Sequence, residues 1–312
     1  MSLAFVYAGQ GSQYSGMGRD LYENYPIFRS TMDAIDPGGD IKRLCFEAPM
    51  EELSQTENTQ KAMVAFAVAM TETLREYGFL PAAAAGLSLG EYSALYAAGV
   101  FSASDAMDIV SFRGRVMAEA AAGVDSKMVA VLKGDIEKIK ESCVAASSLG
   151  IVSVANYNCP DQVVIGGEAR AVDKAVELIL ATGARRCVPL TVSGPFHTPI
   201  MEPAAVKMEE KLNKVKLGPM KIPVYFNVTG RKWTEGESIP QLLTEQVKSP
   251  VHFSSIIKAL AEDGVDRILE IGPGKVLSGF IRKTEPKLKT YSVDSLESLE
   301  KLLLEKKGIV NE

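Results

Sequence analysis

A serine flanked by glycines, in a turn between a predicted strand and a predicted helix, constrains the fold of this chain most. The turn reads Gly86-Leu87-Ser88-Leu89-Gly90 and matches the pattern G-x-S-x-G. The small residues 82–85 precede it as a predicted strand, and a predicted helix follows it through Ala98. Side chains at the glycines would collide with neighbouring backbone, and the N–H groups that open the helix point at the serine. The pattern predicts an α/β fold with a nucleophilic Ser88; a purely structural turn is the alternative.

The order of the other predicted elements indicates two units, as expected for 312 residues. A strand over 3–7 leads into a glycine-rich turn, and helices are predicted over 59–77 and 104–121, the second with Ser104 as N-cap. The pattern then changes to a strand at 128–132, a helix at 136–145, strands at 151–155 and 162–165, a helix at 171–180 and a strand at 185–188. This β-α-β-β-α-β order is that of the ferredoxin-like unit. We expect a ferredoxin-like small domain over 124–189, inserted into a larger α/β domain formed by 1–123 and 190–312.

The segment after the insert continues the large domain. Its predicted helices cover 201–215, 239–247 and 254–262, its predicted strands cover 224–226 and 267–270, a turn at 272–274 opens another helix, and 301–307 form the charged end of a last helix. The segment 272–275 resembles a phosphate-binding loop only loosely, because it lacks the full spacing. We interpret it as a structural turn.

Composition and charge limit the functions that are open to the chain. Lys and Arg total 34 against 39 Asp and Glu, a formal net charge of -5, which argues against general nucleic-acid binding. The longest apolar run, residues 62–70, is far shorter than the roughly 20 residues that span a bilayer. No basic segment typical of a signal peptide precedes the first strand. The four cysteines, Cys45, Cys143, Cys159 and Cys187, are scattered without a neighbouring histidine. We expect a cytoplasmic protein with reduced thiols, no bound metal and no membrane association.

The serine needs a base to take its proton, and the chain has only two histidines. His197 lies in the turn-rich segment 193–199, directly after the strand that leaves the insert, where a rigid scaffold can aim a side chain. His252 lies in the segment 249–253, where a packing or surface role is favoured. We therefore interpret His197 as the base; the order serine then histidine is that of α/β-hydrolase-like enzymes.

Two further features leave alternatives open. Arg113 lies on a helix of mainly apolar residues, so it either pairs with a carboxylate or extends to water, and composition alone favours water. The main-chain N–H of Gln10, in the first glycine-rich turn, would form an oxyanion hole with the N–H of Leu89. The alternative for Gln10 is a turn with no role in chemistry.

In combination, these segments resemble the malonyl-CoA:acyl-carrier-protein transacylases over essentially the whole chain. The matching segments are Ala8-Gly9-Gln10-Gly11-Ser12-Gln13, Gly86-Leu87-Ser88-Leu89-Gly90-Glu91-Tyr92, Arg113 in its helix, Val154-Ala155-Asn156-Tyr157-Asn158, Gln162-Val163-Val164-Ile165-Gly166-Gly167, Gly194-Pro195-Phe196-His197, Gln246 ahead of Ser249-Pro250-Val251, and Glu270-Ile271-Gly272-Pro273-Gly274-Lys275-Val276-Leu277. Several such segments in the same order are far more specific evidence for the family than any one segment alone. The resemblance implies an α/β-hydrolase-like large domain with a ferredoxin-like small domain.

The resemblance also implies a two-step transfer of malonyl from malonyl-CoA, through a serine ester, to the phosphopantetheine thiol of acyl carrier protein for fatty acid synthesis. The implied roles are Ser88 as the acylated residue, His197 as the base, Arg113 as the holder of the malonyl carboxylate, the N–H groups of Gln10 and Leu89 as the oxyanion hole, and the main-chain carbonyl of Gln246 as the group that fixes the histidine tautomer. No resident cofactor is implied; malonyl-CoA is the substrate and coenzyme A the product.

Two details of the chain bear on the choice of acyl group. Leu87 stands where the family most often has histidine. Because that histidine is not the base, its replacement bears on local packing or acyl preference rather than on activity. Phe196, directly before His197, resembles the arrangement that the family associates with selection of malonyl rather than methylmalonyl.

We expect a monomer whose partner is an acidic carrier protein, so this net-negative chain needs a local basic surface near the site. The candidates are Arg185-Arg186, Lys275 and Arg282-Lys283, although each taken singly also fits a solvated surface. Three other functions stay open. They are a stand-alone acyltransferase that loads a polyketide carrier protein, a plain esterase or thioesterase for which Arg113 has no carboxylate to meet, and a catalytically silent carrier-binding or scaffold protein.

Overall fold

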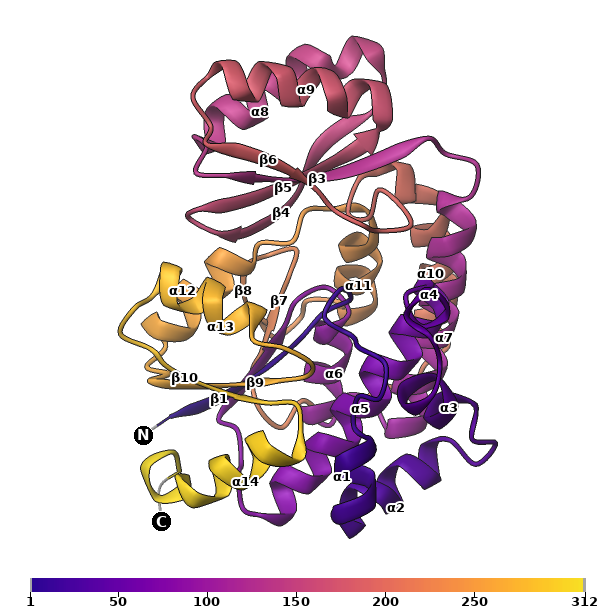
Figure 1. Cartoon of the computed structure of the whole chain (residues 1–312), viewed down its shortest axis with the longest axis vertical. Helices are drawn as coiled ribbons and strands as arrows, with labels where there is room; N and C mark the ends of the chain where they lie inside the picture. The colour runs from indigo at the N-terminus through magenta and orange to yellow at the C-terminus, as the bar shows by residue number, and fades with distance from the viewer. Residues whose placement is uncertain (1, 311–312) are drawn as a thin grey trace.

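A computed structural model describes residues 2–310 and shows a large body built on one sheet, with a smaller sheet and two helices above it (Figure 1). The large sheet consists of β1 (Leu3–Tyr7), β2 (Ala83–Gly86), β7 (Val224–Phe226), β8 (Arg231–Lys232), β9 (Arg267–Ile271) and β10 (Lys289–Val293). Its order is β10-β9-β1-β2-β7-β8, and all neighbours run parallel except β7 and β8. The carboxyl ends of β1, β2 and β9 therefore lie at one edge, where Tyr7 pairs with Gly86 and with Ile271.

The central strands are buried on both faces, as expected for a parallel sheet covered by helices on each side. Successive residues of β1 enter different cores: Phe5 and Tyr7 pack with the helices on one face, while Ala4 and Val6 pack with those on the other. The short side chains of β2, Ala83–Gly86, leave room for a helix to pack closely on the strand.

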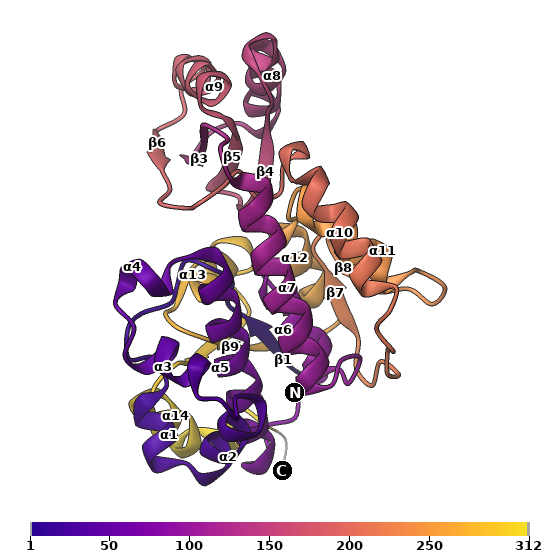
Figure 2. The same cartoon turned by 90° about the vertical axis from the view of Figure 1, so that its right-hand side faces the viewer.

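Helices surround the large sheet in two groups. They are α1 (Arg19–Asn24), α2 (Pro26–Ile35), α3 (Asp40–Phe46), α4 (Met50–Leu53), α5 (Thr56–Glu76), α6 (Gly90–Ala97), α7 (Ala103–Ala121), α10 (Glu202–Leu212), α11 (Ile239–Lys248), α12 (Phe253–Glu262), α13 (Val276–Thr284) and α14 (Leu296–Leu304), with 3-10 turns at Pro199–Met201 and Lys306–Gly308. One face carries α12 and α13, and the larger core on the other face includes α5, α6 and α7. Figure 2 shows α7 running up to the small sheet.

The small sheet has the predicted β-α-β-β-α-β order. Its elements are β3 (Ser126–Leu132), α8 (Ile136–Ala146), a 3-10 turn at Ser147–Leu149, β4 (Val152–Cys159), β5 (Gln162–Glu168), α9 (Ala169–Ala181) and β6 (Arg186–Pro189). The strands pair antiparallel in the order β4-β5-β3-β6. One face packs on α8 and α9. The other face turns to the large body, because Met128 and Val164 belong to the core of that body.

Main-chain hydrogen bonds join the small sheet to the large body. The N–H of Tyr157 donates to the carbonyl of Val251 (2.8 Å), and the N–H of Val251 donates to the carbonyl of Ala155 (2.9 Å). The segment after α11 thus continues the small sheet for one residue at the edge of β4. The position of β4 over the large sheet is fixed by backbone rather than by side chains alone.

Most predicted elements are confirmed within a few residues, and the exceptions are mainly short elements and helix ends. The segment 19–53 holds α1 to α4, and the sequence analysis named none of these short helices. The strands β8 and β10 were also missed, and the helix predicted over 201–215 begins as a 3-10 turn and ends at Leu212. In residues 2–310 no helix is both long and apolar enough to cross a membrane.

The predicted N-cap of α7 is wrong: Ser102, rather than Ser104, caps the helix. The Ser102 hydroxyl accepts from the N–H of Asp105 (3.0 Å), and the Asp105 carboxylate accepts from the N–H of Ser102 (3.3 Å). This reciprocal capping box satisfies two of the N–H groups that a helix start leaves without partners. Ser104 lies inside the first turn and is exposed.

We expect Ser102→Ala to lower the free energy of unfolding by about 1 kcal/mol, because it removes the cap of α7. Ser104→Ala is the matched control, since it removes the same hydroxyl from an uncapped position of the same turn. Urea denaturation followed by circular dichroism measures both. Equal effects of the two substitutions would contradict the assignment of the cap.

Candidate active site

The strand-to-helix turn at Ser88 depends on the two glycines for steric reasons. A Cβ at Gly86 would lie 2.0 Å from the carbonyl carbon of Gly90, and a Cβ at Gly90 would lie 2.2 Å from the carbonyl oxygen of Tyr7. Main chain therefore packs on main chain where β1, β2 and α6 meet. Ser88 has a φ of 52°, in the left-handed region that non-glycine residues rarely adopt. The predicted elbow is confirmed as a conformation.

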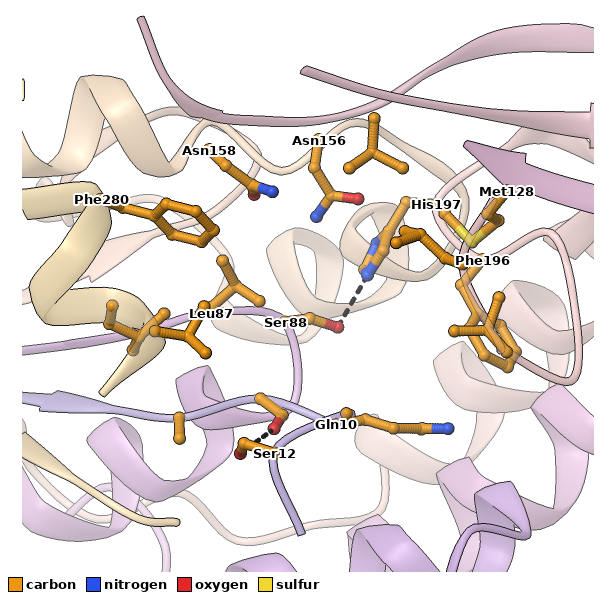
Figure 3. Close-up of a pocket in the computed structure, with 18 of the residues that line it drawn as sticks. Gln10, Ser12, Leu87, Ser88, Met128, Asn156, Asn158, Phe196, His197 and Phe280 are labelled. Atoms are coloured by element: carbon orange, nitrogen blue, oxygen red, sulfur yellow. Dashed lines mark hydrogen bonds between the residues drawn. The ribbon is translucent and has the colours of Figure 1, made fainter. Parts of the chain in front are cut away.

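Ser88 and His197 are in direct contact, as predicted. The hydroxyl Oγ of Ser88 lies 2.7 Å from Nε2 of His197 (Figure 3). On the other side of the ring, Nδ1 of His197 lies 2.7 Å from the main-chain oxygen of Gln246. Because a carbonyl can only accept, the proton sits on Nδ1 and leaves Nε2 free to accept from the serine hydroxyl. The main chain of His197 is also held, since its N–H donates to the carbonyl of Val247 (3.2 Å).

The imidazole is kept neutral by its surroundings. Burial, and next the positive charge of Arg113, lower the pKa of His197 to about 4, against the opposing effect of the Gln246 carbonyl. A neutral ring at neutral pH is the form that can accept a proton. His197 is therefore always available as a base in the physiological range.

Arg113 is turned inward, so the expectation from composition that it extends to water is wrong. The residue is 1% exposed and its Nη2 donates to Oγ of Ser88 (3.1 Å) and to Oε1 of Gln246 (3.1 Å). Its guanidinium lies over the ring of Tyr92, 5.2 Å from the centroid. Nε has no partner, and among the described residues no carboxylate oxygen lies within 4.0 Å of the guanidinium. Burial lowers the pKa of Arg113, yet the site holds a cation without a counter-ion.

Three further polar side chains hold the turn at Ser88 through hydrogen bonds, and the sequence analysis assigned them no such role. The side chain of Asn227 accepts from the N–H of Ser88 (2.6 Å) and donates to the carbonyl of Gly86 (2.7 Å). The side chain of Gln246 donates from Nε2 to the carbonyl of Ser88 (2.9 Å). The carboxylate of Glu91 accepts from the N–H of Asn227 (2.5 Å). The sequence offered only a partial signal, an asparagine directly after a predicted strand, because the position of β7 beside β2 is known only from the structure.

The two predicted oxyanion donors lie in the turns that follow neighbouring strands. Gln10 follows β1 and Leu89 follows Ser88, and within residues 2–310 neither main-chain N–H donates to a protein acceptor. The side chain of Gln10 donates from Nε2 to Oγ1 of Thr56 (3.2 Å), so the turn is anchored to the start of α5. Two unused N–H groups at the open edge of the sheet are what an oxyanion hole needs.

A cavity of about 420 Å³ lies between the small sheet and the large body, with Ser88, His197 and Arg113 in its wall. Leu87 and Phe280 form an apolar part of this wall, and Met128 and Phe196 form another. The side chains of Asn156 and Asn158 extend into the cavity from β4 (Figure 3). Asn158 Oδ1 is buried and has no partner.

The remaining predicted features are structural. His252 stacks on Tyr157, with ring centroids 5.0 Å apart, which agrees with the packing role. The turn at 272–275 is also structural, because the Glu270 carboxylate accepts from the N–H groups of Leu277 (2.9 Å) and Ser278 (2.7 Å). The start of α13 thus holds the protein's own carboxylate where a phosphate would bind. Throughout the described residues, no three His, Cys, Asp or Glu gather as they would around a metal ion.

The chain is similar to known proteins over most of its length. Residues 4–301 match the family described as "Acyl transferase domain". The chain is 43% identical over 301 residues to the malonyl CoA-acyl carrier protein transacylase of Bacillus subtilis (strain 168), covering 96% of this chain and 95% of the relative. It is 39% identical over 283 residues to the protein of the same name from Escherichia coli (strain K12), covering 90% and 92%.

Solved structures give the same result. The crystal structure of MCAT from Streptococcus pneumoniae is 46% identical, with a TM-score of 0.93 over 97% of this chain and 100% of that one. A malonyl-transacylase solved in complex with a type II PKS acyl-carrier protein is 37% identical, with a TM-score of 0.93 over 97% and 99%.

We expect Gly90→Ala to lower the free energy of unfolding by about 3 kcal/mol or more, because the added methyl group overlaps the main chain of β1. Reaction of Ser88 with a small sulfonyl fluoride, followed by intact mass, should be lost at the same time. Gly279→Ala in α13 is the control, since a Cβ there meets no heavy atom within 4 Å. If Gly90→Ala were as stable and reactive as the control, the elbow would not depend on this close approach.

Proposed function

This chain belongs to the malonyl-CoA:acyl-carrier-protein transacylase family, and from that membership and the site we propose how it works. It is an acyltransferase that moves malonyl from malonyl-CoA to the phosphopantetheine thiol of acyl carrier protein, which supplies fatty acid synthesis. One observation carries the choice of substrate: the buried Arg113 guanidinium, 3.1 Å from the Ser88 hydroxyl, has no carboxylate partner. A substrate with a free carboxylate completes this site.

The first half of the reaction acylates Ser88. Nε2 of His197 takes the hydroxyl proton as Oγ attacks the thioester carbonyl, and the N–H groups of Gln10 and Leu89 bind the oxyanion. The intermediate collapses to the malonyl-serine ester, and the leaving thiolate of coenzyme A takes the proton from His197. In the second half the carrier-protein thiol gives its proton to His197 and attacks the ester, and Ser88 recovers its proton as it leaves.

The substrate carboxylate also tunes the base. The charge of Arg113 is one of the two causes that lower the pKa of His197. A malonyl carboxylate on the guanidinium neutralises that charge, so the imidazolium formed during attack is less disfavoured than in the empty site. An acetyl group cannot do this. Arg113 thus favours malonyl in two ways. It binds the malonyl carboxylate, and its charge keeps the pKa of His197 low unless a bound carboxylate neutralises that charge.

The cavity suits the rest of the substrate. A phosphopantetheine arm carries amide groups and a dimethyl-substituted carbon, so it needs both hydrogen-bonding and apolar wall. Asn156 and Asn158 offer side-chain amides on one side, and Leu87 and Phe280 offer apolar surface on the other. Leu87 in place of a histidine makes this wall more apolar.

We extend the proposal to the protein's organisation. The large domain, 1–123 and 190–312, is α/β-hydrolase-like, and the small domain, 124–189, is ferredoxin-like. The enzyme is a cytoplasmic monomer without a resident cofactor, and its carrier protein is acidic. The exposed side chains Arg185, Arg186, Lys275, Arg282 and Lys283 supply the basic surface. A polyketide carrier protein is the alternative partner, since one structural relative was solved with such a protein.

Intact-mass measurement after mixing with malonyl-CoA tests the proposal directly. We expect a long-lived malonyl adduct on Ser88, discharged by acyl carrier protein. Rapid decay without carrier protein would instead indicate a hydrolase, and failure of Ser88 to label would indicate a silent binding protein. Competition between fatty-acid and polyketide carrier proteins for the adduct separates the two transferase functions.

Arg113→Ala should slow malonyl loading about 30- to several-thousand-fold, because loss of a buried, hydrogen-bonded charge pair costs about 2–5 kcal/mol. Loading from acetyl-CoA should be unchanged or faster, since the charge that weakens His197 is gone. Single-turnover acylation with the two thioesters measures both.

Arg115→Ala is the matched control, because Arg115 lies on the same helix with its side chain 58% exposed. If Arg113→Ala slowed both thioesters equally, the role of Arg113 in selecting malonyl would be wrong.

The pH dependence of acylation reports the state of His197. Because its pKa in the free enzyme is lowered to about 4, the base is neutral above that value. We expect kcat/KM for malonyl-CoA to stay level from pH 7 to about 5 and to fall as pH approaches 4. Circular dichroism at each pH separates titration from unfolding. An inflection at 6.5 in folded enzyme, the ordinary value for histidine, would contradict this environment for the base.

A further inference from the structure

Glu91 is a buried carboxyl group that the transfer chemistry does not use. It lies in the first turn of α6, three residues after the nucleophile, and is 0% exposed. Its Oε2 accepts from the main-chain N–H of Asn227 (2.5 Å), and its Oε1 is buried without a partner. Burial of a carboxyl group costs free energy of folding unless its oxygens are hydrogen-bonded or the group is held neutral, so its position here needs an explanation.

Asn227, which Glu91 contacts, has all its hydrogen-bonding groups engaged. Its side chain donates to the carbonyl of Gly86 (2.7 Å) and accepts from the N–H of Ser88 (2.6 Å), so one amide spans the elbow. Its main-chain N–H goes to Glu91, and its carbonyl accepts from the N–H of His252 (2.8 Å). The residue is 0% exposed. It therefore acts as a fixed clamp rather than as a group that meets substrate.

The elbow needs such a clamp for two reasons. Ser88 holds a left-handed φ of 52°, and a conformation of this kind persists only where the surroundings enforce it. The bond to Asn227 also occupies the N–H of Ser88, so this amide cannot compete for the substrate oxygen. The N–H of Leu89 then remains as the donor on this side of the site.

We propose that Asn227 and Glu91 are positioning residues for the nucleophile. Asn227 holds both ends of the elbow so that the Ser88 hydroxyl meets His197, and Glu91 holds the main chain of Asn227. The role rests on the proposed acylation of Ser88, but it concerns the reactivity of the serine hydroxyl toward any electrophile, including a sulfonyl fluoride.

The protonation state of Glu91 gives this role a signature. Arg113 faces it from α7, Tyr92 follows it in α6, and the side chain of Gln246 from α11 is uncharged. From β1, the Tyr7 hydroxyl is bonded to Thr71 (2.8 Å). Burial raises the pKa of Glu91 to about 8, against the lowering effects of Asn227, Gln246 and Arg113. Glu91 is thus neutral at pH 7, and above pH 8 its negative charge, which acts on Arg113 through space, opposes binding of the malonyl carboxylate there.

Two reagents separate the functions of the site. Malonyl-CoA needs Ser88 and Arg113, whereas phenylmethanesulfonyl fluoride has no carboxylate and reports Ser88 and its base alone. We expect Asn227→Ala to slow both reactions about 100-fold, the size of effect that a displacement of about 1 Å produces. Glu91→Ala should also slow both the reaction with malonyl-CoA and the reaction with the sulfonyl fluoride. Thr73→Val is the control, since it removes another buried hydrogen bond (2.8 Å, to Ala69) in α5 and should change neither rate.

The pH profile provides a second readout, because a purely structural role of Glu91 would not make KM for malonyl-CoA depend on pH. In the wild-type enzyme KM for malonyl-CoA should rise above pH 8, while sulfonylation continues without an inflection there. In Glu91→Gln, which keeps an acceptor oxygen but cannot ionise, the rise in KM should be absent. This comparison is made within each variant and therefore does not depend on how stable Asn227→Ala is.

Three results would overturn the proposal. Wild-type rates in folded Asn227→Ala would show that the clamp is not needed. Loss of malonyl loading with normal sulfonylation would place Asn227 in substrate binding instead. Wild-type rates of both reactions in folded Glu91→Ala, or a rise in KM that persists in Glu91→Gln, would show that Glu91 has neither the positioning role nor the pH signature assigned to it. Failure of the proposed function has a different pattern: the wild-type enzyme would then be sulfonylated but not malonylated.

Discussion

The site depends on the contact of bare main chain between β1, β2 and the start of α6. Glycines at 86 and 90 allow this approach, which brings the turns after two strands together at one edge of the sheet. The turn must then reverse over very few residues, and Ser88 takes a left-handed conformation as a result. Every other feature of the site compensates for that geometry or uses it. The amides of Asn227 and Gln246 fix the turn, and the main-chain N–H groups of Gln10 and Leu89 beside it have no protein acceptor within residues 2–310.

The charges of the site explain why a carbonyl, and not a carboxylate, orients His197. Gln246 holds the imidazole with its main chain and Arg113 with its side chain, so the two contacts belong to one residue. An ionised acid at this position would provide Arg113 with a permanent counter-ion and would weaken its attraction for a substrate carboxylate. A carbonyl fixes the tautomer without adding charge. The neutral form of Glu91 has the same consequence, because it leaves the Arg113 cation without a counter-ion.

The sequence was sufficient for the parts of this site that local pattern or chain order determines. The elbow, the pairing of Ser88 with His197 and the β-α-β-β-α-β insert follow from spacing, turn residues and the presence of only two histidines. The direction of the Arg113 side chain does not, because an apolar helix can turn one arginine inward or outward, and its partners Ser88 and Gln246 are brought to it only by the tertiary fold. Asn227 was missed because its contact with Ser88 depends on strand order, which the sequence alone did not give.

The backbone connection between the two sheets also positions the wall of the cavity. The chain that orients His197 through Gln246 continues to Val251, whose main chain pairs with the edge of β4. That strand carries Asn156 and Asn158 into the cavity. One short segment of backbone therefore sets both the base and the amide side of the wall relative to Ser88. A displacement of the small sheet would be transmitted to this segment, so we infer that the two parts of the site are held in register by these backbone hydrogen bonds.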